Sequence, residues 1–153
     1  MSGKNLIENP ACVIVDIDGT LSDATHRQHL VRGPKKKFDE FYDLCDKDEL
    51  HSHIAVLVNL MSPTYKIVLV SGRVERIRQK TVAWMKRSWV AYDELFMRPD
   101  GDFRPDDVLK EEILDRDILP RFTPIMAFDD RDRVVAMWRR RGVPCLQVAP
   151  GDF

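Results

Sequence analysis

Two pairs of aspartates are the residues of this sequence best suited to chemistry. Asp16 and Asp18 follow an apolar run in VIVDIDGT, and Asp129 and Asp130 follow another in IMAFDDR. Four carboxylates that meet at one place repel one another unless some are protonated or a cation is shared. An all-oxygen set of ligands is typical of Mg²⁺, which also keeps waters and substrate phosphates as ligands. The sequence therefore predicts a magnesium site if the two pairs meet.

The spacing within the first pair indicates what its carboxylates would do. One residue separates Asp16 from Asp18, so in extended chain both side chains point to the same side. One aspartate would attack phosphorus to give an aspartyl-phosphate, while the other would handle the proton of the leaving oxygen. The alternative is that Asp18 and Gly19 form only a hairpin turn. A turn, however, explains neither Asp16 nor the second pair.

A polar tripeptide after another apolar run offers an anion-binding group. Ser71, Gly72 and Arg73 follow the run Lys66–Val70, and we expect them to open a helix. The N–H groups of a helix N-terminus and an arginine can converge on a phosphate. The alternative is that Ser71 is simply an N-cap. Because the tripeptide is expected at the same sheet edge as the aspartates, we favour the anion site.

A lysine four residues beyond an aspartate lies near the start of another predicted helix. Asp106 and Lys110 would share one face of that helix. Close to the first aspartate pair, Lys110 would offset the charge of a phosphate and hold the attacking carboxylate in place. Otherwise it would form only an exposed ion pair with Asp106, which contributes little. The spacing leaves both interpretations open.

The apolar pattern predicts the elements that must position these residues. Five β-branched, apolar runs are candidate strands: Cys12–Ile17, Lys66–Val70, Glu94–Met97, Ile125–Phe128 and Pro144–Val148. They do not alternate polar with apolar, which is typical of a parallel sheet covered on both faces. Segments of helical spacing separate them, so we expect a doubly wound, mainly parallel α/β sheet. Ligands of such sheets bind beyond the carboxyl ends of the strands. The strands that carry the two aspartate pairs are expected to be neighbours there.

The connection between the first two strands is too long for a plain crossover. It includes Phe38, Phe41 and Tyr42 at helical spacing, and we interpret Ser22–Glu49 as a small cap over the carboxyl edge of the sheet. The cap also carries Arg32 and a run of three lysines, Lys35, Lys36 and Lys37. Such a run is usually a solvated face, but it would also guide a polyanion toward the aspartates.

Length and composition limit the domain organisation, the cellular compartment and the partners that the sequence allows. The 153 residues carry 24 Lys+Arg against 25 Asp+Glu, for a net charge of −1, and 44% of them are hydrophobic. This balance is typical of one globular domain, and it leaves nucleic acid to be attracted only by a local basic patch. No apolar run approaches the roughly 20 residues of a membrane span, so we expect a cytoplasmic protein. Three widely spaced cysteines, Cys12, Cys45 and Cys145, indicate free thiols rather than disulfides or a zinc site.

The motifs, in order, resemble those of the haloacid dehalogenase superfamily. The four that match are DIDGT, Ser71, Lys110 and the pair Asp129-Asp130. The resemblance implies a Rossmann-like core in which Asp16 is the nucleophile and Asp18 the general acid/base. It also implies that Ser71 and Lys110 bind phosphate. The implied ligands of Mg²⁺ are Asp16, the backbone carbonyl of Asp18, and Asp130, with Asp129 nearby.

Longer segments are similar to one family within that superfamily, the phosphatase domains of bacteriophage polynucleotide kinase-phosphatases. They are VSGR, RPDDVLKEEI, AFDDR, VVAMWRRRGVPCLQVA and the final GDF. The resemblance implies a 3′-phosphatase acting on nucleic-acid ends, with Arg27, Arg73 and Asp106 as further active-site residues. We also place Thr20 and Gly72 among the phosphate-binding residues. The kinase half of that family needs a GxxxxGK[ST] loop, which this sequence lacks, so we expect residues 1–153 to form a single phosphatase domain, with any kinase or ligase supplied separately.

The expected function is therefore a Mg²⁺-dependent phosphomonoesterase that removes 3′-phosphate from DNA or RNA ends or from 3′-nucleotides. A small-molecule phosphatase or 5′-nucleotidase of the same superfamily is the nearest alternative. A receiver-like phospho-acceptor module is a third possibility, since it also arranges acidic residues, a hydroxyl and a lysine around Mg²⁺. It would place its acceptor aspartate at the end of the third strand, where this sequence has Phe96, Met97 and Arg98, and is therefore disfavoured.

Overall fold

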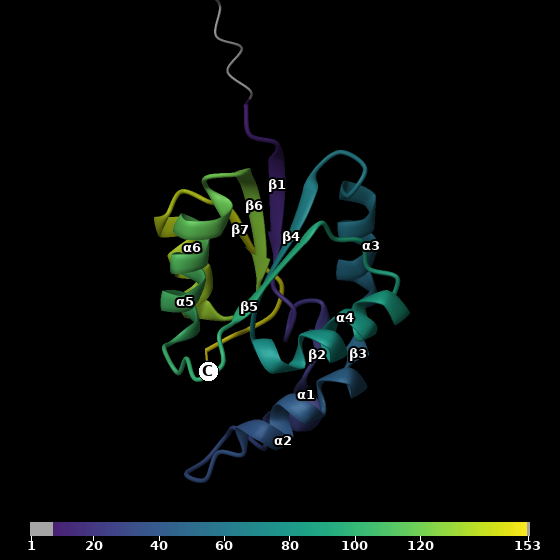
Figure 1. The fold of residues 1–153 in the computed structure, drawn as a ribbon, viewed down its shortest axis with the longest axis vertical. Helices are drawn as coiled ribbons and strands as arrows, with labels where there is room; N and C mark the ends of the chain where they lie inside the picture. Colours follow the sequence, from purple (N-terminus) through teal and green to yellow (C-terminus); the bar gives the residue numbers. More distant parts are fainter. Residues whose placement is uncertain (1–7, 153) are drawn as a thin grey trace, which may run out of the picture.

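A five-stranded parallel sheet is the framework of the protein, whose computed structural model describes residues 8–152 (Figure 1). Its strands are β1 (Ala11–Val15), β4 (Lys66–Val74), β5 (Glu94–Arg98), β6 (Thr123–Asp129) and β7 (Cys145–Gln147). Their order in the sheet is β5-β4-β1-β6-β7, and all neighbouring pairs run parallel. The predicted α/β class and the adjacency of the strands that precede the two aspartate pairs are both confirmed.

Helices cover both faces of this sheet, which explains why its strands are continuously apolar. Helices α3 (Ser52–Met61) and α4 (Arg78–Arg87) lie on one side, and α5 (Asp106–Ile113) and α6 (Asp132–Arg140) on the other (Figure 1). Successive strand residues point to opposite faces. Val13 and Val15 therefore pack with α3 and α4, whereas Cys12 and Ile14 pack with α5 and α6.

A small insertion follows β1, where the sequence predicts a cap. It contains a two-stranded antiparallel ribbon of β2 (Ser22–Asp23) and β3 (Glu49–Leu50), helices α1 (Thr25–Gln28) and α2 (Phe38–Asp43), and a 3₁₀ turn at Cys45–Lys47. Figure 1 shows these elements beyond the carboxyl ends of the strands, next to α4. Two α4 side chains tie the insertion to the core: Lys80 Nζ donates to the Asp43 carbonyl at 2.7 Å, and Arg87 donates to the Asp46 carbonyl at 2.8 Å.

The helix start predicted at Ser71 is wrong. Strand β4 continues to Val74, a 3₁₀ turn spans Glu75–Ile77, and α4 begins only at Arg78. Ser71 instead pairs with Met97 of β5. The extended conformation persists because the last residues of β4 still line buried space, with Ser71 and Arg73 both at 0% exposure. The first strand also ends earlier than predicted, at Val15, so Asp16 directly follows it.

Two other expectations concern cysteines and membranes. Cys12, Cys45 and Cys145 are buried, free thiols, as predicted. Within residues 8–152, no helix combines the length and the hydropathy needed to cross a bilayer.

Candidate active site

Strands β1 and β6 bring three of the four predicted carboxylates together. Asp16 follows β1, and its backbone N–H donates to the Phe128 carbonyl of β6 at 3.0 Å. Asp129 is the last residue of β6, and Asp130 comes next. Carboxylate oxygens of Asp16, Asp129 and Asp130 lie within 4.8 Å of one another, and all three residues are buried. The structure thus forms the predicted carboxylate cluster, but without the side chain of Asp18.

One ammonium group contacts two of these three carboxylates. Lys110 of α5 extends its Nζ to 2.7 Å from Asp16 Oδ1 and 2.8 Å from Asp129 Oδ2, and it is only 2% exposed. The alternative of an exposed Asp106–Lys110 pair is therefore excluded. Burial alone would lower the pKa of Lys110, but Asp129 and Asp16 outweigh burial and raise it. We call Asp16, Asp129, Asp130 and Lys110 the acidic cluster.

The acidic cluster has more negative charge than its lysine can neutralise. Burial raises the pKa of Asp16 well above its ordinary value, and repulsion from Asp129 and Asp130 adds to this effect. Burial, followed by repulsion from Asp129, raises the pKa of Asp130 from 3.8 to about 6. Three carboxylates against one ammonium leave two negative charges when all groups are ionised. A divalent cation would balance that charge.

The donor set and its surroundings also fit a hard cation such as Mg²⁺. All the ligand atoms are carboxylate oxygens, which Mg²⁺ prefers over nitrogen or sulfur. Gly19 makes room for Asp130, since a Cβ at Gly19 would lie 2.1 Å from Asp130 Oδ2. Its φ of +88° also requires glycine. The turn after β1 is thus shaped so that Asp130 reaches the cluster.

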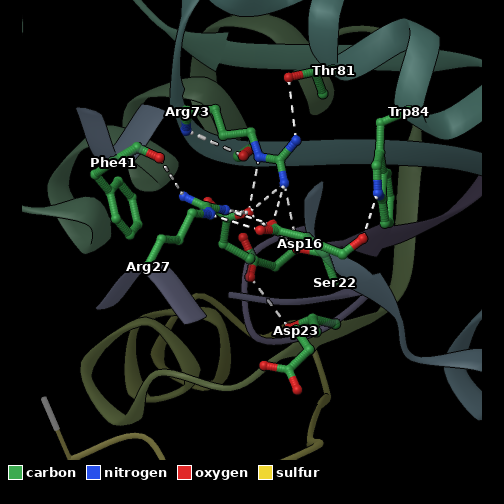
Figure 2. A network of polar contacts seen from close by, with 12 residues as sticks. Asp16, Ser22, Asp23, Arg27, Phe41, Arg73, Thr81 and Trp84 are labelled. Carbon is green, nitrogen blue, oxygen red and sulfur yellow. Dashed lines mark hydrogen bonds and ion pairs between the residues drawn. The ribbon is translucent and has the colours of Figure 1, made fainter. Parts of the chain in front are cut away.

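Asp18 belongs to a second network, whose arginines, Arg27 and Arg73, are labelled in Figure 2. Its Oδ1 accepts hydrogen bonds from Arg27 of α1 at 2.8 Å and from Arg73 Nε at 2.8 Å. Asp48, next to β3, accepts from Arg27 Nε at 2.7 Å and from Arg73 at 2.9 Å. Ser22 Oγ lies between the two carboxylates, at 3.1 Å from Asp18 and 2.9 Å from Asp48. We call Asp18, Asp48, Arg27 and Arg73 the arginine cluster.

The arginine cluster balances its own charge, with two carboxylates against two guanidinium groups, and His26 Nε2 also lies 2.8 Å from Asp48 Oδ1. Burial alone would raise the pKa of Asp18, but Arg73 and Arg27 outweigh burial and lower it to about 2. Arg27, Arg73 and the side chain of Asp48 are 0% exposed. Figure 2 shows the guanidinium of Arg27 beside Phe41, whose ring centroid lies 4.1 Å from Arg27 Cζ.

Sequence reasoning missed Asp48. It is one of several charged residues in DLCDKDEL, and nothing in its spacing separates it from Asp46 or Glu49. The structure distinguishes it because the ribbon of β2 and β3 carries it back to the start of the insertion. Its backbone carbonyl also accepts a hydrogen bond from Trp84 Nε1 of α4 at 2.9 Å, which fixes its position relative to the core.

The other predicted residues divide into those that line one cavity and those that do not, the latter being Thr20, Arg27, Ser71 and Arg73. Thr20 Oγ1 donates to Asp16 Oδ2 at 3.2 Å, and Ser71 Oγ accepts from the Arg73 backbone N–H at 3.2 Å. Asp106 pairs with Arg98 and Arg131 and sits so close to Gly72 that a Cβ there would lie 2.9 Å from its Oδ1. The cavity has a volume of about 750 Å³. The predicted residues that line it are Asp16, Asp18, Gly72, Asp106, Lys110, Asp129 and Asp130.

The fold and this cavity together define the class of the protein. A parallel sheet with an aspartate pair after β1, a lysine from α5 and a second pair after β6 is the arrangement of haloacid dehalogenase-like hydrolases. A haloacid dehalogenase-like family hydrolase from Streptococcus pneumoniae has the same fold, with a TM-score of 0.58 at 13% identity, over 91% of this chain and 84% of that one.

Within this class, the chain belongs to the family of polynucleotide kinase PNKP phosphatase domains, whose family model matches residues 10–153. A protein of Autographa californica nuclear polyhedrosis virus, named as a bifunctional polynucleotide kinase/RNA ligase, is 30% identical over 140 residues, which are 90% of this chain and 19% of that protein. A chain in the solved structure of the Pnkp1/Rnl/Hen1 RNA repair complex is 34% identical, with a TM-score of 0.82, over 95% of this chain and 44% of that one. The chain thus spans less than half the length of these relatives.

Proposed function

We propose that this protein is a Mg²⁺-dependent phosphatase that removes 3′-phosphates from nucleic-acid ends through an aspartyl-phosphate on Asp16. Membership in the PNKP phosphatase-domain family supports the reaction and the substrate. The single observation that carries the proposal is the convergence of the Asp16, Asp129 and Asp130 carboxylates in one cavity, with Lys110 bound to the first two.

Asp16 is the proposed nucleophile because both of its carboxylate oxygens are held and the residue lines the cavity. Lys110 contacts Oδ1 and Thr20 contacts Oδ2, which fixes the direction of attack. A bond forms between Asp16 and phosphorus as the ester bond to the nucleoside 3′-oxygen breaks. Lys110 stabilises the negative charge that this step concentrates near the acidic cluster.

Mg²⁺ would be held by Asp16 and Asp130, with Asp129 beside them, and would supply charge neutralisation for the phosphoryl group. The backbone carbonyl of Asp18 is the further ligand that the family resemblance implies. The remaining chemistry belongs to side chains of the chain itself.

Asp18 is the proposed general acid and base. The Arg27 and Arg73 bonds both go to its Oδ1, which leaves Oδ2 to exchange a proton in the cavity. A phosphate dianion nearby raises the pKa of a carboxylate by like-charge repulsion, so a bound substrate promotes the protonated form that the leaving oxygen needs. Once the product has left, the arginines favour the ionised form that activates water against the aspartyl-phosphate.

Arg27 and Arg73 therefore act on the reaction mainly through Asp18. Both are fully buried and engaged by Asp18 and Asp48. This arrangement favours a positioning role over direct contact with the phosphate. The proposed partners are a nucleic-acid end and a kinase or ligase activity that acts on the same ends, because one relative is named as a polynucleotide kinase/RNA ligase and another belongs to an RNA repair complex.

Phosphate release from matched oligonucleotides that carry a 3′- or a 5′-phosphate tests this proposal, with free 3′- and 5′-nucleotides alongside, in Mg²⁺ and in chelator. We expect release from the 3′-phosphorylated oligonucleotide in Mg²⁺ and its loss in chelator. Equal rates on 5′-phosphorylated substrates would support a broad phosphatase or 5′-nucleotidase instead. Full activity in chelator would exclude the metal.

A further inference from the structure

The cavity is larger than a phosphate requires. Its volume of about 750 Å³ lies within the range of sites that enclose whole small-molecule ligands. The carboxylates form only part of its wall. Much of the rest comes from the insertion, including α2, and from the loop at residues 99–105, between β5 and α5. Figure 1 shows the insertion beyond the sheet edge and the β5–α5 loop next to α5.

Phe103 is the most exposed large apolar side chain in the described part of the chain, and it lines this cavity at 87% exposure. The backbone on both sides of it is fixed. Arg98, itself 6% exposed, donates to the carbonyls of Asp102 at 3.2 Å and Arg104 at 2.7 Å. The Asp102 carboxylate accepts the Arg104 backbone N–H at 2.9 Å. The loop therefore presents the Phe103 ring to solvent from a backbone that is already ordered.

Basic side chains line the same cavity as Phe103. Arg32 and Lys36 come from the insertion, and Arg131 and Arg133 from the beginning of α6. Phe38 of α2 adds a second, 42% exposed ring on the side of the insertion, with Lys36 Nζ 5.8 Å from its centroid. Two exposed aromatic rings and several cations in one cavity fit a single-stranded nucleic acid, whose bases stack on the rings while its phosphates attract the cations.

We propose that Phe103 stacks on one of the last two nucleobases of a strand whose 3′-phosphate lies at Asp16, and so makes the enzyme select polynucleotide ends over small phosphate esters. This proposal rests on the proposed function and adds the residue that determines its specificity. An exposed ring on a fixed loop binds a base with little further loss of conformational entropy. The preference extends to any base because every base has a π-face.

The test compares wild type and Phe103→Ala on two 3′-phosphorylated oligonucleotides, one intact and one in which the last two nucleotides lack their bases. We expect Phe103→Ala to lower kcat/KM on the intact strand about 10-fold, the size of one lost base–aromatic stack. On the base-free strand it should have no effect. Phe103→Tyr should keep the wild-type rate. Trp89→Ala is the matched control, because Trp89 is 86% exposed but is not among the residues that line the cavity.

The outcomes separate this proposal from the one on which it rests. If wild type releases phosphate from the intact strand and Phe103→Ala loses nothing, the stacking site is wrong and the 3′-phosphatase stands. An equal loss on both strands would likewise overturn stacking, since the ring would then act without a base. If wild type releases no phosphate from either strand, both proposals fail.

Discussion

Asp16 and Asp18 lie two positions apart after β1, yet their carboxylates have opposite surroundings. Asp16 shares Lys110 with Asp129 and lies close to Asp130, and burial together with these acidic neighbours raises its pKa. Asp18 faces two arginines, which lower its pKa to about 2 although burial opposes this. The comparison is therefore between the excess of negative charge in the acidic cluster and the balanced network of the arginine cluster.

The difference shows which part of the site is complete without a ligand. In the arginine cluster every charge has a partner within the chain, so its geometry is set before substrate arrives. In the acidic cluster the net charge is left for a ligand to neutralise, and buried like charges are costly until one does. Aspartates thus fix the geometry of the arginine cluster, whereas in the acidic cluster they supply negative charge that a ligand can neutralise.

Replacing the nucleophile should have the largest effect and should separate activity from stability. Asp16→Asn removes the attacking oxygen, and we expect single-turnover phosphate release to fall by about 10⁴-fold or more. In metal-free buffer the variant should be at least as stable as wild type, because it removes one of the repelling charges. Rapid-quench kinetics and thermal unfolding in chelator measure the two effects. Normal turnover would exclude Asp16 as the nucleophile, and a large loss of stability would contradict the excess of charge.

The same chemical change in the balanced cluster should have the opposite effect on stability. Asp48→Asn leaves two buried guanidinium groups with one carboxylate, and an unpaired buried charge costs about 3–5 kcal/mol. We expect the free energy of unfolding in urea to fall by that amount. Asp39→Asn is the matched control: the Asp39 side chain is 88% exposed and pairs with Arg76, so its loss should cost less than about 1 kcal/mol.

A second variant checks that charge balance is the cause. Adding Arg27→Met to Asp48→Asn restores equal numbers of charges, and part of the lost stability should return. If the double variant is as unstable as the sum of the two single changes, the two residues are not coupled and the balance has no role.

Much of this comparison could be predicted from the sequence. The pairs that contain Asp16 and Asp130 each follow an apolar run, and parallel strands place their carboxyl ends at one edge. Lys110 was identified, but its spacing from Asp106 could not distinguish a buried partner of Asp16 from a surface pair. That choice depends on how α5 rotates against the sheet, which only packing decides.

The rest depends on contacts between segments with no local signal. Asp48 is distinguished only when the insertion folds back against α4, and Phe103 only when the loop before α5 reaches the cavity. The sequence around Ser71 and Arg73 is typical of a helix start. In the structure β4 nevertheless continues through both residues, because their side chains face buried space. Local propensity yields to tertiary packing at such positions.

The pH dependence of stability gives the smallest effect and distinguishes the clusters by sign. The folded pKa of Asp130 is raised from 3.8 to about 6, so between these values the folded state holds a proton that the unfolded chain has lost. Stability in chelator should therefore fall by about 1–3 kcal/mol as pH rises from 4 to 6. The folded pKa of Asp18 is lowered from 3.8 to about 2, so its contribution is lost in the other direction, as pH falls from 4 to 2.

Adding Mg²⁺ distinguishes the titration of the acidic cluster from the titration of other groups in the protein. A cation that binds the ionised carboxylates stabilises the folded state by about 2.7 kcal/mol at 100 times its Kd, and this should cancel the fall between pH 4 and 6 while leaving the loss below pH 4 unchanged. Urea unfolding across pH, with and without Mg²⁺, measures both the fall in stability between pH 4 and 6 and the loss of stability below pH 4. Asp130→Asn should reduce the fall between pH 4 and 6 in chelator, though Asp16, whose pKa is also raised, remains, and it should reduce the response to Mg²⁺. A fall between pH 4 and 6 that persists in both Mg²⁺ and Asp130→Asn would assign it to groups outside the acidic cluster.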